Sequence, residues 1–159
     1  GRESSGIFVG NPIGWLLRNV NSSLALFKDN GVRGFSKVLI AIRPGRRNKR
    51  FIDVADKICS HFGASLTLLN IVGESDNNQK VKRTEKSSSE LISETKSKSV
   101  VKIIRSNNPV EAISEESASY DLLILGTPEK DNWIRVLFGA GEDRFVKKAA
   151  CSVLRLTIK

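Results

Sequence analysis

Two stretches of the chain have residue types and spacing that suit the binding of an anion. Residues 43 to 50 hold four arginines and a lysine, whose groups bind phosphate or carboxylate oxygens through charge-assisted hydrogen bonds. Residues 126 to 141 contain glycines, which let backbone N–H groups approach a phosphate closely. Each stretch has a simpler explanation, a solvated basic loop for the first and turn glycines for the second.

Little else in the chain suits catalysis or metal binding. His61 is the sole histidine and stands at the end of an apolar helical pattern, which does not favour a role as a base. Cys59 and Cys151 lie outside any C-x-x-C spacing, so we expect two buried thiols in a reducing compartment. We therefore expect no enzyme activity, no catalytic residues and no metal site.

The elements that must position the two loops alternate between apolar runs and helical patterns. The apolar runs predict five strands, at Lys37 to Ile42, Leu66 to Val72, Val100 to Ile104, Leu122 to Leu125 and Val153 to Ile158. Such alternation predicts an α/β fold, an open five-strand parallel sheet with helices on both faces. Ligands of these sheets bind beyond the carboxyl ends of the strands, where both loops begin.

The helices between these strands differ in the strength of their patterns. Apolar spacing predicts a helix from Phe51 to Phe62 that stops at Gly63, and another that begins at Pro109. Residues 73 to 98 are so polar that we expect a weak, exposed helix there or partial disorder. Phe145, Val146 and Ala149 belong to a last predicted helix.

The N-terminal third carries nearly all of the excess charge. The net charge of the 159 residues is +9, and the first 50 residues hold ten basic residues against Glu3 and Asp29. From Ile13 to Phe27, apolar residues recur at steps of three and four, which predicts an amphipathic helix. This face meets either a membrane surface or the protein's own sheet or a second subunit. We assign residues 1–35 to a flexible lead and basic amphipathic helical arm, and residues 36–159 to the α/β domain.

Residues 122 to 156, L-L-I-L-G-T-P-E-K-D-N-W-I-R-V-L-F-G-A-G-E-D-R-F-V-K-K-A-A-C-S-V-L-R-L, resemble the closing segment of universal stress proteins. In that family an ATP-phosphate loop has a glycine, two residues, a second glycine, nine residues, and a third glycine followed by Ser or Thr. Gly126 and Gly139 match the first and third glycines. The resemblance implies an adenine nucleotide alpha hydrolase-like fold.

The same segment departs from the family pattern at two positions. Glu129 replaces the second glycine, and Ala140 replaces the hydroxyl residue. Many family members also carry an Asp after the first strand, where this chain has Arg43. The cofactor-binding positions implied by the resemblance are Arg43, Gly126, Thr127, Gly139, Ala140 and Gly141. We expect the sequence of this ATP-binding loop to be degraded, so that no cofactor is bound. Binding of ATP is the alternative.

The resemblance implies a non-enzymatic regulatory or assembly domain, and the alternative is a sensor that binds ATP or another adenine nucleotide. Similar domains are fused to the cytosolic tails of transporters, which fits the basic arm and a fragment that lacks methionine. The expected partners are a second copy, through an exposed final strand, the membrane-embedded portion of the same chain and an anionic membrane surface. Nucleic acid is not expected, because no recognition motif is present. We expect a location on the cytosolic side of a membrane protein.

Overall fold

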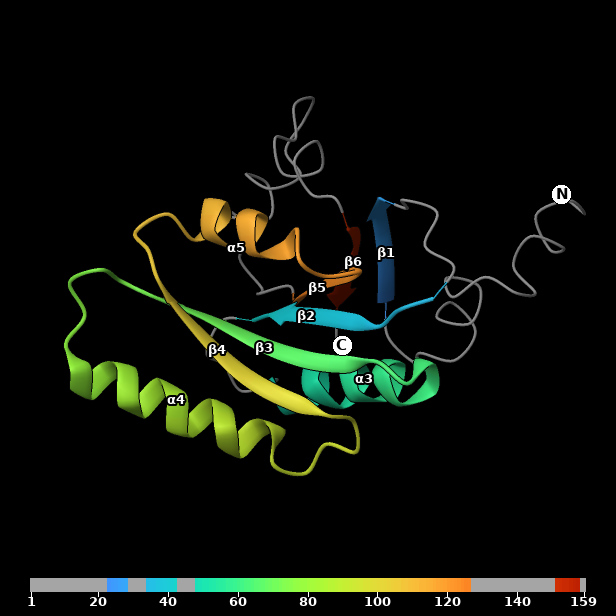
Figure 1. Ribbon diagram of the computed structural model, residues 1–159, viewed down its shortest axis with the longest axis horizontal. Coiled ribbons are helices and arrows are strands. Elements are labelled where there is room, and N and C mark those ends of the chain that lie inside the picture. The colour runs from blue at the N-terminus through green and yellow to red at the C-terminus, as the bar shows by residue number, and fades with distance from the viewer. Residues whose placement is uncertain (1–22, 29–33, 43–47, 127–150, 158–159) are drawn as a thin grey trace, which may run out of the picture.

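The computed structural model describes residues 23–28, 34–42, 48–126 and 151–157 (Figure 1). Within them are three helices, α3 (Asn48–Phe62), α4 (Asn78–Ile92) and α5 (Pro109–Ser117). The strands are β1 (Ser23–Lys28), β2 (Lys37–Ala41), β3 (Ser65–Val72), β4 (Ser99–Arg105), β5 (Leu122–Gly126) and β6 (Ser152–Thr157). The predicted last helix around residues 145 to 149 lies outside the described residues.

The strands form one sheet in the order β1-β6-β5-β2-β3-β4. The five strands from β2 to β6 pair in parallel with one another, as predicted, and their ranges match the apolar runs closely. Figure 1 shows α5 on one face of the sheet and α3 and α4 on the other. The predicted doubly covered parallel sheet is therefore confirmed.

The prediction of a helix from Ile13 to Phe27 is wrong at its end, because residues 23–28 form the strand β1. Residues 23–28 pair antiparallel with β6, from Ser23 opposite Thr157 to Lys28 opposite Val153, with one irregularity in register. Unpaired N–H and C=O groups along β6 offer hydrogen bonds that a local amphipathic pattern does not reveal. The part of the predicted helix before residue 23 lies outside the described residues.

The pairing of β1 also changes the expectation of a dimer. The sequence suggested that the last strand would be an exposed edge for a second copy, but β6 lies between β1 and β5. The chain itself therefore supplies the strand that covers this edge. A homodimer stays a prediction, but an exposed edge of β6 no longer supports it.

The core consists of two layers, one on each face of the sheet. Val38 and Ile40 of β2 pack in the layer that includes Ile52 and Ile58 of α3. Leu39 of β2 belongs to the other layer, with Leu123, Leu125 and Ile113 of α5. This alternation follows from the period of two in a strand, and each fully buried Leu or Ile contributes about 1.5–3 kcal/mol. The sheet can therefore hold its strand ends in fixed positions.

The chain between β3 and β4 forms α4, a regular helix despite its polarity. Asn77 caps its N-terminus by accepting a hydrogen bond from the backbone N–H of Lys80 at 2.8 Å. Ser88 is the one buried residue among those of α4. The prediction of an exposed helix in this region is confirmed, and the alternative of partial disorder there is wrong for residues 78–92.

Two aspartates connect loops at the amino-terminal edge of the sheet. Asp121 accepts hydrogen bonds from the backbone N–H groups of Ser36 and Lys37, both at 2.9 Å. Asp56 of α3 accepts bonds from the N–H groups of Lys96 and Ser97, both at 2.9 Å, and from the Ser97 hydroxyl at 2.6 Å. Asp56 therefore ties α3 to the loop before β4.

The pKa of Asp56 is lower than its ordinary value. Burial alone would raise it, but the hydrogen bonds from Ser97 and Lys96 favour the charged form more strongly. A carboxyl group whose pKa is lowered by folding stabilises the protein above its unfolded pKa. This contribution disappears as the pH falls through the folded pKa.

Substitution of Asp56 should therefore destabilise the fold in a pH-dependent way. We expect Asp56→Ala to lower the free energy of unfolding by about 1–3 kcal/mol at pH 7, because three donors lose their acceptor. Urea titrations should show the difference from the unmodified protein shrinking as the pH falls below the ordinary pKa of an aspartate, about 3.9. The control Asp53→Ala, on the same helix, removes an exposed carboxylate that pairs with Lys49, and it should have an effect below about 1 kcal/mol. Equal losses in the two variants would contradict this role of Asp56.

Candidate functional site

The order of the strands reverses direction at β2. From β2 the chain proceeds outward through β3 and β4, and it then returns to the other side of β2 to form β5 and β6. Ala41 of β2 pairs with Leu125 of β5, so Ile42 and Gly126 follow at neighbouring strand ends. Ligands of open parallel sheets bind beyond the carboxyl ends of the strands at such a reversal. The two loops identified in the sequence begin at this point.

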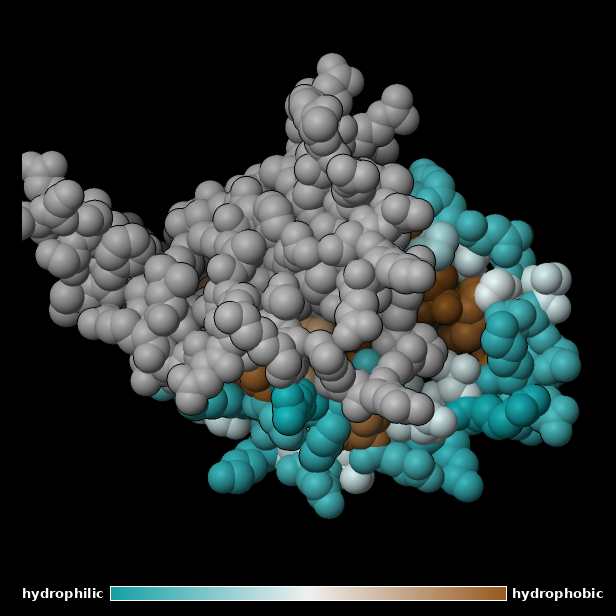
Figure 2. Space-filling model, turned by 180° about the vertical axis from the view of Figure 1, so that it is seen from behind, coloured by the Kyte–Doolittle hydropathy of each residue, from teal (hydrophilic) through white to brown (hydrophobic). Residues whose placement is uncertain are grey.

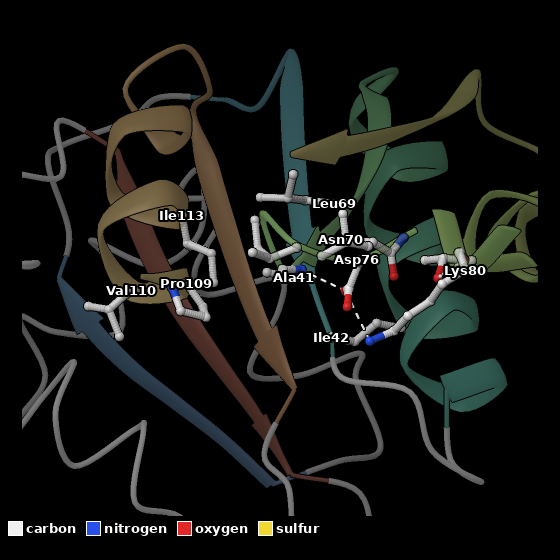
Figure 3. A pocket seen from close by; sticks show the side chains of 13 residues that line it. Ala41, Ile42, Leu69, Asn70, Asp76, Lys80, Pro109, Val110 and Ile113 are labelled. Carbon is white, nitrogen blue, oxygen red and sulfur yellow. Dashed lines mark hydrogen bonds and ion pairs between the residues drawn. The ribbon is translucent and has the colours of Figure 1, made fainter. Parts of the chain in front are cut away.

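A cavity of about 420 Å³ lies beside this reversal, and we call it the strand-end cavity. It extends from the carboxyl ends of β2 and β3 to the first turns of α4 and α5. In Figure 3, Pro109, Val110 and Ile113 line it from α5, and Asp76 and Lys80 lie across from them. Ala41, Ile42 and Leu69 complete an apolar wall. Cavities of this size, apolar with a few polar groups, are typical of small-molecule sites.

Asp76 is the carboxylate that lines this cavity. Its Oδ2 atom accepts a hydrogen bond from the backbone N–H of Gly73 at 2.7 Å and pairs with Nζ of Lys80 at 2.9 Å. The hydrogen bond with Lys80 is the main reason that the pKa of Asp76 is lower than usual, followed by the bond from Gly73. Asp76 is therefore charged at neutral pH and holds Lys80 over the cavity.

Arg105 at the end of β4 fixes the turn that carries Asp76. Its guanidinium group donates to the backbone carbonyl of Asp76 at 2.7 Å and to the side-chain oxygen of Asn78 at 3.2 Å. These bonds connect β4 to the start of α4. The position of Asp76 is thus fixed by contacts with Gly73, with Lys80 of α4 and with Arg105 of β4.

Asn70 is a buried polar residue in the middle of the apolar strand β3. Its side-chain N–H donates to the hydroxyl of Ser88 in α4 at 2.7 Å, and 9% of the residue is exposed. Its Oδ1 atom has no hydrogen-bond partner among the described residues. Whichever way the amide is turned, one polar atom bonds to Ser88 and the other is left for a ligand. Asn70 lines the cavity and is a candidate for ligand recognition.

A second cavity, of about 380 Å³, adjoins the first, and we call it the α3–α4 lobe. Ile42, Asn70, Lys80 and Thr84 line both spaces. The lobe has a floor of apolar side chains, and its walls hold polar groups from the two helices. Viewed from behind the orientation of Figure 1, hydrophobic side chains show in a hollow between hydrophilic ones (Figure 2). The site therefore has two connected parts of different chemistry.

The site residues predicted from the sequence are only partly placed. Gly126 is the last residue of β5, at the reversal, as its position in the loop required. The other predicted residues lie outside the described residues: Arg43, Thr127, Gly139, Ala140 and Gly141. Glu129 lies outside them too. Asn70, Asp76 and Lys80 were not anticipated from the sequence.

The remaining chemical groups of the described chain lie apart from the two cavities. Both cysteines are buried and unpaired with each other, as expected, and burial raises the pKa of Cys59 to about 12. His61 lies in the last turn of α3, with its ring 4.7 Å from that of Phe62. Among the described residues no His, Cys, Asp and Glu side chains gather as a metal site would require. None of the described helices has the length and apolar character needed to cross a bilayer.

Comparison with known proteins identifies one sequence family. The profile of the universal stress protein family matches residues 34–156. No curated protein has a significant sequence match to the chain.

Several solved structures share the fold. A universal stress protein in complex with cAMP is 16% identical, with a TM-score of 0.58 over 78% of this chain and 98% of that one. A universal stress protein from Archaeoglobus fulgidus in complex with dAMP is 15% identical, with a TM-score of 0.56 over 76% and 97%. Universal stress protein UspA from Lactobacillus plantarum is 17% identical, with a TM-score of 0.53 over 77% and 98%. At these identities the likeness concerns the fold alone.

The bond between Asn70 and Ser88 gives a prediction about the serine run at 87 to 89. Ser88→Ala should lower the free energy of unfolding by about 1–2 kcal/mol, because it leaves a buried amide N–H without its acceptor. Ser89→Ala is the matched control, since Ser89 is exposed on the same helix and alanine favours helices. Thermal or urea unfolding should show no loss for this control. Similar losses in both variants would contradict the structural role of Ser88.

Proposed function

Because the chain belongs to the universal stress protein family, we propose that it is a non-enzymatic regulatory domain whose glycine loop no longer holds a triphosphate. The domain keeps a cavity for a small ligand but responds to something other than ATP. Its output is contact with another protein or with the rest of its own chain.

The observation that carries this proposal is the acidic residue in the loop that begins at Gly126. Gly126 ends β5 beside the carboxyl end of β2, where the phosphates of a nucleotide would have to lie. Glu129 is three residues further on, at a position where the family pattern has glycine. A carboxylate about 4 Å from a phosphate oxygen costs about 4 kcal/mol at an effective dielectric constant of 20. Ala140 removes a hydroxyl donor as well.

The alternative is a sensor of adenine nucleotides, and the strand-end cavity favours it. The cavity lies at the reversal and has an apolar wall with a buried amide, features that suit a nucleobase. Two structural neighbours are described in complex with dAMP and cAMP, ligands that each carry a single phosphate. A nucleotide with one phosphate needs fewer hydrogen bonds from the glycine loop than ATP does. Loss of ATP binding is therefore compatible with a retained cavity.

We also propose that the domain works next to a membrane protein. The excess of basic residues in the first 50 residues supports this, since cytosolic segments near a membrane are rich in Lys and Arg. An amphipathic helix lying on the membrane was a second argument for this location. It is weakened because residues 23–28 form the strand β1 and not part of such a helix. The proposal thus rests on charge and not on an apolar helix face.

Restoration of the family pattern should restore ATP binding. We expect titration calorimetry with ATP and Mg²⁺ to give no heat for the unmodified chain up to millimolar ligand. The double variant Glu129→Gly, Ala140→Ser should bind ATP with micromolar affinity, because it removes the opposing charge and supplies the hydroxyl.

The matched control is Asp131→Gly, which removes one negative charge from the same stretch but at a position where the family pattern needs no glycine. It should leave ATP binding absent. Micromolar binding of ATP by the unmodified chain, abolished by Gly139→Trp, would overturn the proposed function and establish the sensor instead.

A further inference from the structure

We propose that the outer side of α4 is a docking surface for an anionic lipid bilayer. The surface is formed by Lys82, Arg83 and Lys86, and we call it the basic crest. Its partner is a membrane leaflet that contains acidic phospholipids. This inference rests on the proposed location beside a membrane protein, and it goes further because it names the face of the domain that meets the membrane.

The two faces of the sheet carry helices of opposite charge. On one face, α4 contains four Lys and Arg residues against two glutamates, and α3 contains three against two aspartates. On the other face, α5 contains three glutamates and no basic residue (Figure 1). Lys102 of β4 pairs with one of these glutamates, Glu116, and leaves the other two. A negatively charged plane therefore attracts the face with α3 and α4 and repels the face with α5.

Helical geometry gathers the three cations of the basic crest on the outside of α4. At 3.6 residues per turn, Lys82, Lys86 and Arg83 lie within about 100° of arc around the helix axis. All three are exposed, whereas Ser88, on the opposite side of the helix, is buried. The next acidic residue within this arc is Glu90, in the last turn. The outward side of the preceding turns is therefore positive.

The charges of the basic crest are not neutralised within the part of the chain that the structure describes. Lys82, Arg83 and Lys86 form no ion pair there, in contrast to Lys80, which pairs with Asp76 at 2.9 Å. Lys86 is four residues from Lys82 and three from Arg83, spacings at which like charges on a helix repel one another. An anionic surface removes this repulsion, so docking has a favourable term that the free domain lacks.

The composition of α4 favours a bilayer over a nucleic acid as the anionic partner. No residue of α4 is aromatic, so the helix has no ring on which a base could stack. The basic first 50 residues add attraction to the same kind of surface. Each Lys or Arg close to an acidic leaflet raises the affinity about fivefold, and this effect falls off within about 10 Å at 0.1 M salt. Side chains on the outside of a helix satisfy that condition.

The first test measures binding of the whole chain to lipid vesicles by sedimentation. We expect binding to vesicles of phosphatidylcholine with phosphatidylserine, little binding to phosphatidylcholine alone, and loss of binding at about 0.5 M salt. The double variant Lys82→Gln, Lys86→Gln should lower the affinity about 25-fold, because it removes two cations of the basic crest. These two lysines line neither the strand-end cavity nor the α3–α4 lobe, so the candidate ligand site is left unchanged.

The matched control is Lys37→Gln, Lys98→Gln, which removes the same net charge from two exposed lysines. Lys37 begins β2 and Lys98 precedes β4, so both lie at the amino-terminal edge of the sheet. The affinity of this control for the vesicles should stay within about twofold. Equal losses in the two double variants would show a general effect of net charge and contradict the docking surface. No loss in either variant would assign the binding to the basic N-terminal residues and overturn the inference as well.

A second measurement determines which face of the domain meets the bilayer. Ser89→Cys places a thiol on the exposed side of α4, and Ser119→Cys places one just after α5. The native thiols of Cys59 and Cys151 are buried, so a fluorophore reacts selectively with the new thiol. Lipids with spin-labelled head groups should quench the fluorophore at position 89 more strongly than the one at position 119. Equal quenching at the two positions would contradict the proposed orientation.

Nucleic acid is the competing partner. An oligonucleotide that binds more tightly than the vesicles at the same salt concentration, and loses affinity in Lys82→Gln, Lys86→Gln, would overturn the assignment of the partner.

Failure of this inference is distinguishable from failure of the proposed function. Absence of binding to anionic vesicles contradicts the docking surface and leaves the ATP titrations unchanged. The proposed location fails separately, if the full protein is absent from the membrane fraction of cells.

Discussion

The central position of β2 is the constraint on which the rest of the structure depends. β2 hydrogen-bonds to β3 on one side and to β5 on the other, and Val38, Leu39 and Ile40 are completely buried. Parallel neighbours require crossover connections, and their right-handedness places α3 and α5 on opposite faces. The chain must then leave β2 in one direction and return on the other side. The strand-end cavity, at the carboxyl ends of β2 and β3, lies beside the reversal that results from this path, so its place depends on the burial of one five-residue strand.

The central sheet could be predicted from the sequence because its signals are local. Each parallel strand is an apolar run buried on both faces, as in Leu122 to Leu125, and such a run is recognisable without knowledge of its partner. β1 could not be predicted in the same way. Its residues have apolar spacing that fits a helix, and the strand forms because β6, more than a hundred residues later, offers an open edge. Long-range pairing of this kind overrides a local pattern.

The reversal of the strand order was predicted from the sequence, whereas the residues that line the two cavities were not. The reversal and the two loops follow from the order of elements, but most polar groups of the two cavities come from the most polar part of the chain, where charge is the usual sign of a solvated surface. Asn70 is a buried polar residue in an apolar run, which the period of a strand does not explain. Its hydrogen bond with Ser88 follows from the fold, because α4 places Ser88 beside it. Sequence reasoning locates strand ends well, whereas it cannot tell which face of a polar helix turns toward them.

Charge distribution rather than volume separates the two cavities. They differ little in size, at about 420 and 380 Å³, and Lys80 lines both, whereas Asp76 lines only the first and Arg83 only the second. Asp76 cannot be neutralised easily, because Lys80 and Gly73 both stabilise its charged form and keep its pKa low. The ion pair also fixes Lys80 at the boundary between the two cavities. The carboxylate that lines the strand-end cavity thus holds a cation at the border with the neighbouring cavity.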